Sequence, residues 1–328
     1  MIDERLLDWL LDPADPSVRC QTLTTLLDKP ETDPDVVDAR QAIMTSGPVP
    51  IILGQMNADG SWGDPTRSYN DKYTGSFWNM ILLAELWADP ADPRVRLACD
   101  FIFDYSQILE SGAFAYTHSN KSGGGLASGS IPCLNGNMVY SLIRLGCLDD
   151  PRLQRAIDWI ATWQRADDGD CELPADKAYK RFEMCWGRHS CHMGVAKSFK
   201  ALASIPPARR SPAVQAKILQ LGEYFLKHHL YKKSHDLASA AKPGWLKPGF
   251  PLMYQTDILE LLDLFASLGW WDERLRDALE ILQGLQMADG RWKLENSFNG
   301  KMLVRIEQKG KPSRWITLKA LRVLEAAT

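Results

Sequence analysis

Apolar side chains follow two alternating patterns along the chain, and both patterns have the spacing of a helix. Segment 151–164 places its apolar residues on one stripe with charged residues opposite, whereas segments 77–87, 138–145 and 258–268 are apolar nearly all round. A helix with one apolar stripe covers a core from one side, and a helix that is apolar all round is buried on every side. The alternation therefore predicts an inner layer of buried helices and an outer layer of half-buried helices.

The half-buried helices begin with a repeated phrase that combines an acidic or serine cap, proline and arginine. It occurs as Asp92-Pro93-Arg94, Asp150-Pro151-Arg152, Arg210-Ser211-Pro212 and Asp272-Glu273-Arg274, after an earlier copy at Asp15-Pro16. Successive arginines of the four later copies are separated by 58, 58 and 64 residues. An Asp or Ser side chain before a helix accepts a free backbone N–H, and proline at the first helical position lacks one. We therefore expect each phrase to start a helix.

This repeat predicts an all-α fold in which five or six helical hairpins close into an α/α toroid with inner and outer rings of helices. Residues 1–328 form a single domain in this interpretation, with N-terminal helices in 1–48 and the repeats in 49–328. The alternative is an open helical solenoid. Solenoid repeats usually span about 34–47 residues, and their helices are rarely apolar all round, so we favour the closed ring.

A second motif follows some of the half-buried helices and combines glutamine, Asp-Gly and an aromatic residue. It spans 55–62, 164–171 and 286–292, and it ends in Trp62, Cys171 and Trp292 respectively. Asp-Gly favours a tight turn because glycine adopts positive φ. A glutamine at a helix end reaches the free carbonyls of the last turn, and the tryptophan is expected to pack back over the hairpin.

Repeated Gln…Asp-Gly-x-Trp motifs on alternating helices resemble the squalene/hopene cyclase and protein prenyltransferase superfamily, over about residues 50–327. The length fits one toroid, as in small standalone bacterial members. The resemblance implies the α/α toroid, but it transfers no functional residue. The string nearest to the cyclase Asp-x-Asp-Asp acid, at 167–170, lies inside the turn motif. Neither the aspartate-rich magnesium motifs of terpene synthases nor the Asp-x-Cys zinc pair of prenyltransferases is found in the sequence.

Composition narrows the class of protein further. Apolar residues make up 45% of the chain, charged residues 24%, and the net charge is −3, which excludes a basic surface for nucleic acid. No apolar run reaches the 18–20 or so residues of a transmembrane helix, and the N-terminus lacks the pattern of a signal peptide. The seven cysteines are odd in number, which favours reduced thiols and a cytoplasmic location. The sequence does not predict an oligomeric state.

The repeat period also predicts where a ligand would bind. Inner helices are expected to begin near Gly75, Cys133, Cys191, Gln255 and Ser313, at matching points of successive repeats. In the superfamily that the chain resembles, these N-termini face the functional end of the cavity, and helix N-termini are electropositive. The predicted substrate-binding residues at this end are Tyr73, Trp78, Asn137, Tyr254, Arg314 and Trp315.

Thiols are concentrated at these predicted helix starts, where Cys133, Cys185, Cys191 and His192 lie. A thiol at a helix N-terminus has a lowered pKa and becomes a better nucleophile, acid or metal ligand. Three interpretations stay open. The thiols pack in the core, or they act in catalysis with His192 as a proton relay, or the three cysteines and His192 bind zinc or iron in a tetrahedral site.

Other segments offer weaker candidates. Asp71 precedes an inner helix and Asp257 lies early in a very apolar helix, so each is a candidate general acid, because burial raises a carboxyl pKa. Segment 296–312 breaks the helical pattern, and we predict a short strand at 302–307 and a lid over the cavity. The basic run 227–235 is expected to be a solvated helix end.

These observations lead to three functional hypotheses. The first is an enzyme that acts on a mostly apolar, isoprenoid-like small molecule by acid–base or cysteine-assisted cyclisation, isomerisation or dehydration. Cys185 and Cys191 would supply the thiol chemistry, and the ring faces of Trp78 and Trp315 would stabilise positive charge. The second is a metalloprotein with a Cys/His site for zinc or iron, and the third is a non-catalytic toroid that binds a lipid or a peptide.

Overall fold

The computed structural model describes residues 3–169, 171–172 and 183–327. The chain is mainly helical, as the sequence predicts, and the one sheet in the described part is a two-stranded hairpin of β1 (Lys232–Lys233) and β2 (Asp236–Ala240). Helices buried over most of their length alternate with helices that bury only one face. No helix within the described ranges is both long and apolar enough to cross a bilayer.

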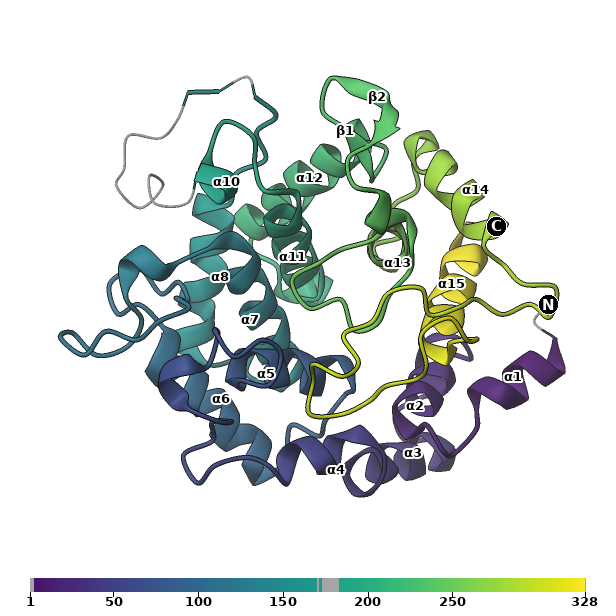
Figure 1. The fold of residues 1–328 in the computed structure, drawn as a ribbon, viewed down its shortest axis with the longest axis horizontal. Coiled ribbons are helices and arrows are strands. Elements are labelled where there is room, and N and C mark those ends of the chain that lie inside the picture. Colours follow the sequence, from purple (N-terminus) through teal and green to yellow (C-terminus); the bar gives the residue numbers. More distant parts are fainter. Residues whose placement is uncertain (1–2, 170, 173–182, 328) are drawn as a thin grey trace.

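Six buried helices lie around the middle of the molecule (Figure 1). They are α2 (Pro16–Thr25), α5 (Ser76–Glu85), α7 (Pro132–Arg144), α11 (His192–Ala203), α13 (Ile258–Ser267) and α15 (Arg314–Ala326). Outside them lie α1 (Glu4–Leu10), α3 (Pro34–Thr45), α4 (Pro48–Leu53), α6 (Pro93–Ser106), α8 (Pro151–Trp163), α12 (Pro212–Lys227) and α14 (Arg276–Gly284). The short α10 (Glu183–Trp186) precedes α11.

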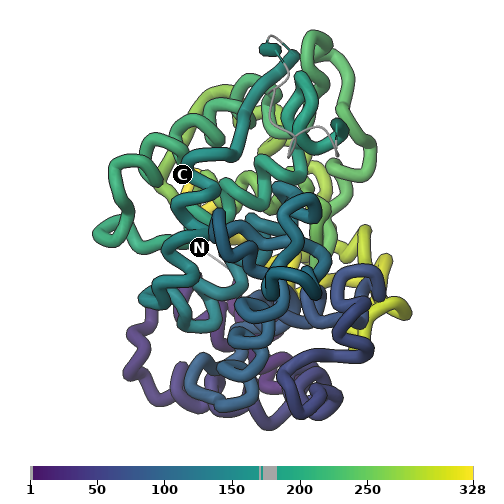
Figure 2. The backbone as a smooth tube through the Cα atoms, turned by 90° about the vertical axis from the view of Figure 1, so that its left-hand side faces the viewer, coloured from purple at the N-terminus to yellow at the C-terminus, as the bar shows by residue number. Residues whose placement is uncertain are grey.

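Neighbouring inner helices pack against one another around the centre. Contacts join α5 to α7, α7 to α11, α11 to α13, α13 to α15, and α15 to α2. Hydrogen bonds join α2 to the C-terminal end of α5. Ser17 Oγ donates to the Leu86 carbonyl over 2.8 Å, and Gln21 Nε2 donates to the Glu85 carbonyl over 3.1 Å. The first and last inner helices are therefore adjacent in space (Figure 1). Seen from the side, α1–α4 lie at one edge and residues near 210–240 at the other (Figure 2).

The capping phrases start helices as predicted. The Asp92 and Asp150 carboxylates each accept the backbone N–H two residues later, and Ser211 Oγ accepts that of Val214. The arginine of the phrase then folds back on its own cap, because Arg94 and Arg152 pair with Asp92 and Asp150 over 2.7 Å. The recurring arginines therefore reinforce helix starts and lie outside the inner ring.

The two complete Gln…Asp-Gly-x-Trp motifs have matching geometry. Trp62 Nε1 donates to the Ile52 carbonyl over 2.7 Å, and Trp292 Nε1 donates to the Leu282 carbonyl over 2.8 Å. The glycine of each Asp-Gly turn, Gly60 or Gly290, has a φ of +87° or +81°, which glycine adopts without strain. Each tryptophan packs back over its hairpin, which confirms this prediction.

Two loops cross the middle of the ring in front of the inner helices (Figure 1). One is 247–257, and the other is the segment 296–312 that precedes α15. Gly249 pairs with Asn296, so the two loops are joined. Residues 302–307 form no strand, contrary to our prediction, because their backbone turns back instead of pairing: Asn299 Nδ2 donates to the Ile306 and Glu307 carbonyls over 3.1 and 2.8 Å.

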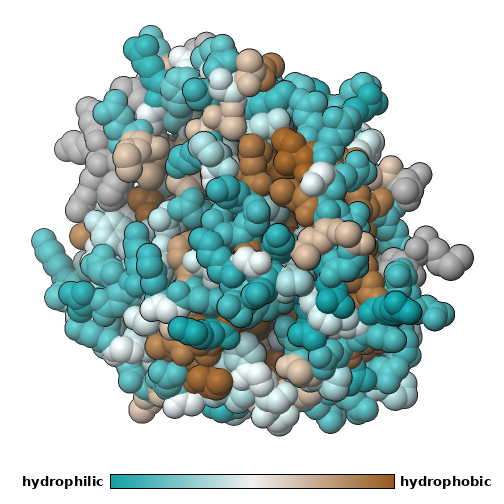
Figure 3. Space-filling model, turned by 45° about the vertical axis from the view of Figure 1, so that its right-hand side comes forward, coloured by the Kyte–Doolittle hydropathy of each residue, from teal (hydrophilic) through white to brown (hydrophobic). Residues whose placement is uncertain are grey.

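The surface seen in Figure 3 is mainly hydrophilic, with small apolar patches between charged side chains. The basic run 227–235 is less exposed than expected. His228 is only 2% exposed, and its Nε2 lies 3.2 Å from Asp168 and 3.1 Å from Ser234 Oγ. The helix end is therefore tied to the turn at 167–169. Asp170, the last residue of the acidic string noted above, lies outside the described residues.

Candidate functional site

The N-terminal ends of the inner helices form one end of the ring, which we call the thiol mouth. Gly75, Cys191, Asp257 and Ser313 are the residues before α5, α11, α13 and α15. Cys133 is the second residue of α7. The predicted starts therefore agree with the structure to within two residues, because the repeat period follows the hairpins closely.

Cys191 is the residue before α11, and its thiol lies beside the thiol of Cys185. The neighbouring Cys185 and the backbone N–H groups of Met193 and Gly194 lower the pKa of Cys191 to about 6, although burial acts in the opposite direction. Cys191 and burial together raise the pKa of Cys185. The pair therefore shares one proton near neutral pH, with a thiolate on Cys191 and a thiol on Cys185.

The third thiol, Cys133, belongs to the adjacent helix α7. Burial, followed by the negative charge of Cys191, raises the pKa of Cys133 to about 12. A Cβ placed on Gly194 would lie 2.7 Å from the Pro132 ring and 3.6 Å from the Cys133 backbone nitrogen. The absence of a side chain at Gly194 thus lets the start of α7 approach the start of α11 and brings the three predicted thiols together.

Aromatic rings gather beside the thiols. The rings of Tyr69, Trp78 and Tyr254 lie 5.6, 5.9 and 5.1 Å from the ammonium group of Lys72, within the range of cation–π attraction. Burial raises the pKa of Tyr69, and nearby Cys133 and Cys185 add to that shift. We call these three rings the aromatic cage, and it adjoins the thiols.

Other predicted binding residues extend this cluster. The Tyr73 ring lies 5.0 Å from Trp78 and 4.3 Å from Phe298, which belongs to the loop that crosses the ring. Asn137 Nδ2 donates to the Met253 carbonyl over 3.2 Å and so fixes the loop that carries Tyr254. Four of the predicted binding residues therefore lie together at the aromatic cage: Tyr73, Trp78, Asn137 and Tyr254.

Trp315 lies apart from the cage and packs on the loop 247–257. Its ring stacks on Phe250 with centroids 4.0 Å apart and an interplanar angle of 8°. Phe250 is 1% exposed and comes from loop 247–257. The loop therefore fills the centre of the ring with an aromatic side chain, and Trp315 packs against this filling.

Arg314 and Asp71 have partners away from the thiols. Arg314 Nε donates to the Trp9 carbonyl over 2.8 Å, and the guanidinium also pairs with Asp12. Asp71 pairs with Arg67 over 2.6 Å and keeps 30% of its side chain exposed. The first residue ties α15 to α1, and the second forms a surface ion pair, so neither belongs to the thiol and aromatic cluster.

The His192 ring is turned toward aromatic groups. It stacks on Trp245 with centroids 4.1 Å apart and meets Phe225 edge-on at 4.8 Å. Burial, with a contribution from His228, lowers the pKa of His192 to about 3, so the ring is neutral. Within the described ranges, no group of three or more His, Cys, Asp or Glu side chains is placed to bind a metal ion.

Asp257 is a buried helix cap beside a pocket of about 340 Å³. Its two carboxylate oxygens accept the N–H groups of Glu260 and Gly249, each over 2.8 Å. Burial raises its pKa to about 6, so the group can carry a proton near neutral pH. Trp245 and Phe298 line the same pocket, which connects it with the His192 stack and the Tyr73 contact.

The sequence analysis missed a group of charged side chains inside the ring. Lys197 Nζ lies 2.7 and 2.8 Å from the two Glu260 oxygens, Lys200 pairs with Glu85, and Lys200 lies 3.1 Å from Glu260. All four are buried. Burial raises the pKa of Glu260, but the charges of Lys197 and Lys200 outweigh it and hold that pKa at about 2. We call these four residues the axial charge network.

A signal for this network was present in the sequence. Each member is a charged residue in a helix whose other residues are mostly apolar or small. A charge in a buried helix needs a partner of opposite sign. Two lysines in α11 and one glutamate in each of α5 and α13 supply the partners, which identifies these helices as neighbours.

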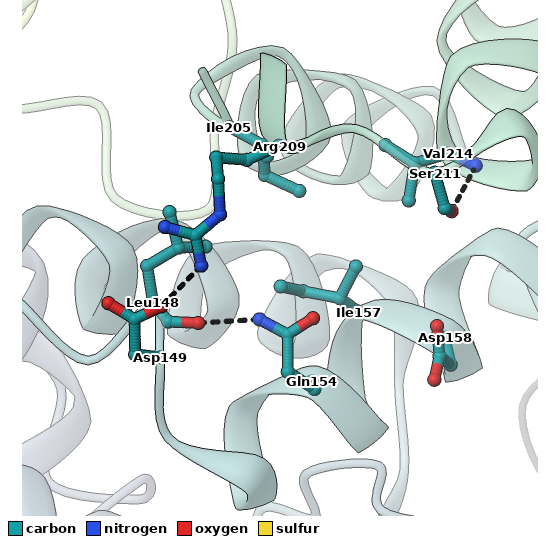
Figure 4. A pocket seen from close by; sticks show the side chains of 9 residues that line it. All are labelled: Leu148, Asp149, Gln154, Ile157, Asp158, Ile205, Arg209, Ser211 and Val214. Carbon is teal, nitrogen blue, oxygen red and sulfur yellow. Dashed lines mark hydrogen bonds and ion pairs between the residues drawn. The ribbon is translucent and has the colours of Figure 1, made fainter. Parts of the chain in front are cut away.

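A further groove, of about 270 Å³, lies between α8 and α12 on the outer layer (Figure 4). Arg209 pairs with Asp149 across it, Gln154 donates to the Leu148 carbonyl, and Ser211 Oγ accepts the Val214 N–H over 3.2 Å. Because these groups bind one another, the groove is less suited to a ligand than the thiol mouth.

Distant structural similarities exist. A protein from Actinoplanes is 15% identical, with 99% of this chain and 98% of that chain covered and a TM-score of 0.45. A variant of the type II terpene cyclase MstE from Scytonema, solved with its substrate geranylgeranyl dihydroxybenzoate, is 15% identical, with 96% and 86% covered and a TM-score of 0.43. Another MstE variant, with the product merosterolic acid A, is 12% identical, with 99% of both chains covered and a TM-score of 0.33.

No known protein-family model and no curated protein matches the chain. The structural similarities are too distant to assign a family or an activity.

Proposed function

We propose that the protein is an enzyme that uses the thiol mouth for acid–base chemistry on a mostly apolar, isoprenoid-like small molecule. The observation that carries this proposal is the placement of Cys185 and Cys191 side by side at the N-terminus of α11, where the pKa of Cys191 is lowered and that of Cys185 is raised. One thiolate and one thiol side by side supply a base and an acid at the same pH. The surrounding helices fit a toroid of six hairpins with inner and outer rings, which would place this pair at the open end of a ring.

The chemistry that fits such a pair is isomerisation or dehydration. In an isomerisation, the Cys185 thiol delivers a proton to one carbon of a double bond, and the Cys191 thiolate removes a proton from a carbon beside the resulting cation, so the substrate keeps its composition. In a dehydration, Cys185 protonates a leaving hydroxyl group while Cys191 removes the proton from the neighbouring carbon, and water leaves. In both cases the pair still holds one proton afterwards.

The aromatic cage supports a substrate that develops positive charge. Its three rings now face the Lys72 ammonium group, and Lys72 is exposed, so its side chain is free to withdraw. Aromatic faces stabilise a cation in proportion to its desolvation. A carbocation or allylic cation in the place of the ammonium group would gain the same stabilisation, and Tyr73 and Phe298 would cover its apolar part.

Solvent deuterium provides the test. The protein is incubated in D₂O with acyclic isoprenoid alcohols, and recovered substrate and products are analysed by mass spectrometry. We expect deuterium incorporation with the natural protein, loss of incorporation in Cys191→Ala and a large decrease in Cys185→Ala. Cys171→Ser is the matched control, because Cys171 lies beside Arg165 rather than in the thiol mouth.

The same experiment separates the proposal from the non-catalytic alternative. A lipid that co-purifies with the protein and takes up no deuterium would favour a binding toroid. Equal incorporation in the natural protein and Cys191→Ala would overturn the role of the thiol pair. A metal content of one zinc or iron per chain that is lost in Cys191→Ser would favour the metalloprotein instead.

A further inference from the structure

The C-terminal ends of the inner helices, opposite the thiol mouth, surround a second pocket of about 400 Å³. Ligand sites for small molecules span roughly 300–1,000 Å³, so this volume is large enough for one. Its buried wall contains Glu85, Lys200 and Glu260 of the axial charge network. The pocket therefore opens onto the axial charge network.

Positive charge exceeds negative charge in this wall. Lys197 takes both oxygens of Glu260, and Lys200 pairs with Glu85 and with one Glu260 oxygen. The third ammonium group, on Lys319, lies 3.8 Å from Glu85 and 5.4 Å from the centre of the Phe250 ring, and it forms no other ion pair in the described part of the chain. Two carboxylates thus serve three ammonium groups. An excess charge in a buried setting is costly unless a counter-ion neutralises it.

Arg144, at the end of α7, adds a second uncompensated cation. Its guanidinium lies over the Trp87 ring at 4.4 Å, and its buried Nε has no hydrogen-bond partner among the residues that the structure describes. None of the ion pairs in the described part of the chain includes Arg144. Stacking on an aromatic ring orients the planar guanidinium and leaves its donors available for two oxygens of an anion.

The other two arginines of the pocket already bind protein groups. Arg210 donates to the Ala203 and Ile205 carbonyls over 2.9 and 2.8 Å, so it caps α11. Arg322 lies 3.2 Å from Asp263. Arg144 and Lys319 are therefore the pocket cations that keep hydrogen-bond donors free for a ligand. Together they match a ligand that carries two negative charges.

We propose that this pocket binds the phosphate or diphosphate group of a small molecule through Arg144, Lys319 and the edge of Lys200. A guanidinium and two ammonium groups suit a phosphate because it offers several acceptor oxygens at once. The pocket lies at the other end of the ring from the thiols, so this site does not rest on the proposed function. Either one can fail while the other holds.

Calorimetric titration with inorganic pyrophosphate at low ionic strength tests the site. We expect saturable binding by the natural protein and at least tenfold weaker binding by Arg144→Gln and by Lys319→Gln. Arg67→Gln is the matched control, because it removes the same charge from a surface ion pair with Asp71, outside this pocket. Its affinity for pyrophosphate should equal that of the natural protein.

Thermal unfolding of each variant distinguishes loss of binding from loss of the fold. A variant that unfolds at the same temperature as the natural protein but binds less pyrophosphate has kept its fold. Lys197 and Lys200 are left unchanged for this reason. No measurable binding by the natural protein would overturn the proposal, and so would weakening by Arg67→Gln to the same extent as by Arg144→Gln. Arg144→Lys should recover part of the affinity, because it restores the charge without the planar donors.

Discussion

Gly136 of α7 lies directly against the backbone of Lys197 in α11, so closely that a Cβ on Gly136 would come 2.3 Å from the Lys197 carbonyl carbon. The same two helices meet again where Gly194 of α11 faces Pro132 of α7. Two glycines, one on each helix, thus set a single close crossing. At one end of this crossing, Cys133 lies close to Cys191. At its middle lies Lys197, whose ammonium group binds Glu260.

Adding a methyl group at this crossing should destabilise the protein. We expect Gly136→Ala to lower the free energy of unfolding by about 1–3 kcal/mol or more, because backbone atoms must move apart. Gly284→Ala is the control, since a Cβ on Gly284 meets nothing within 4 Å at the end of α14. That control should be neutral or stabilising by up to about 1 kcal/mol. Urea unfolding of both variants makes the comparison, and equal stability would contradict the close crossing.

The state of the thiol pair is open to a direct chemical measurement. A thiolate reacts with iodoacetamide and a thiol does not, so the alkylation rate of Cys191 should be half-maximal near pH 6, where its lowered pKa lies. In Cys185→Ala the midpoint should move to higher pH, because the S–H donor is lost. Peptide mass spectrometry across a pH series gives both midpoints. A midpoint near the ordinary thiol pKa of about 8.5 in the natural protein would contradict the shared proton.

The two matching tryptophans should respond alike to substitution. Trp62 and Trp292 are each 1% exposed, and each donates its indole N–H to a carbonyl ten residues earlier. Trp62→Phe and Trp292→Phe remove this hydrogen bond and leave a small void, which should cost each variant about 1–3 kcal/mol. Thermal unfolding tests the prediction, and a large difference between the two would show that the motifs are not equivalent. Trp163→Phe, at a site that is 44% exposed, is expected to cost less.

The sequence predicted what depends on the repeat and missed what depends on distance across the ring. Helix caps such as Asp92, the turn at Gly60 and the starts of the inner helices are local features, so the repeat period located them. Arg314 lies at the correct position along the chain, but its direction depends on packing against α1. Pairing of Lys200 with Glu85 joins residues 115 apart, which no local pattern specifies. The stacking of Phe250 on Trp315 likewise joins residues far apart in the sequence, so no local pattern predicts it.

The pairing of Lys197 with Glu260 is the part of the axial charge network that is easiest to isolate. Either Lys197→Met or Glu260→Gln leaves a buried charge without its main partner, and such losses cost about 3–5 kcal/mol. The double variant removes both charges and should be more stable than the sum of the two losses predicts, with a coupling of about 0.5–3 kcal/mol. Urea unfolding of the four proteins provides the cycle. Arg276 and Glu273, paired over 3.2 Å with side chains 63% and 78% exposed, serve as a surface pair whose removal should cost at most about 1 kcal/mol. Losses at the Lys197–Glu260 pair no larger than those at the surface pair would mean that the interior of the ring is wet, and the excess charge on Lys319 and Arg144 would then need no bound anion.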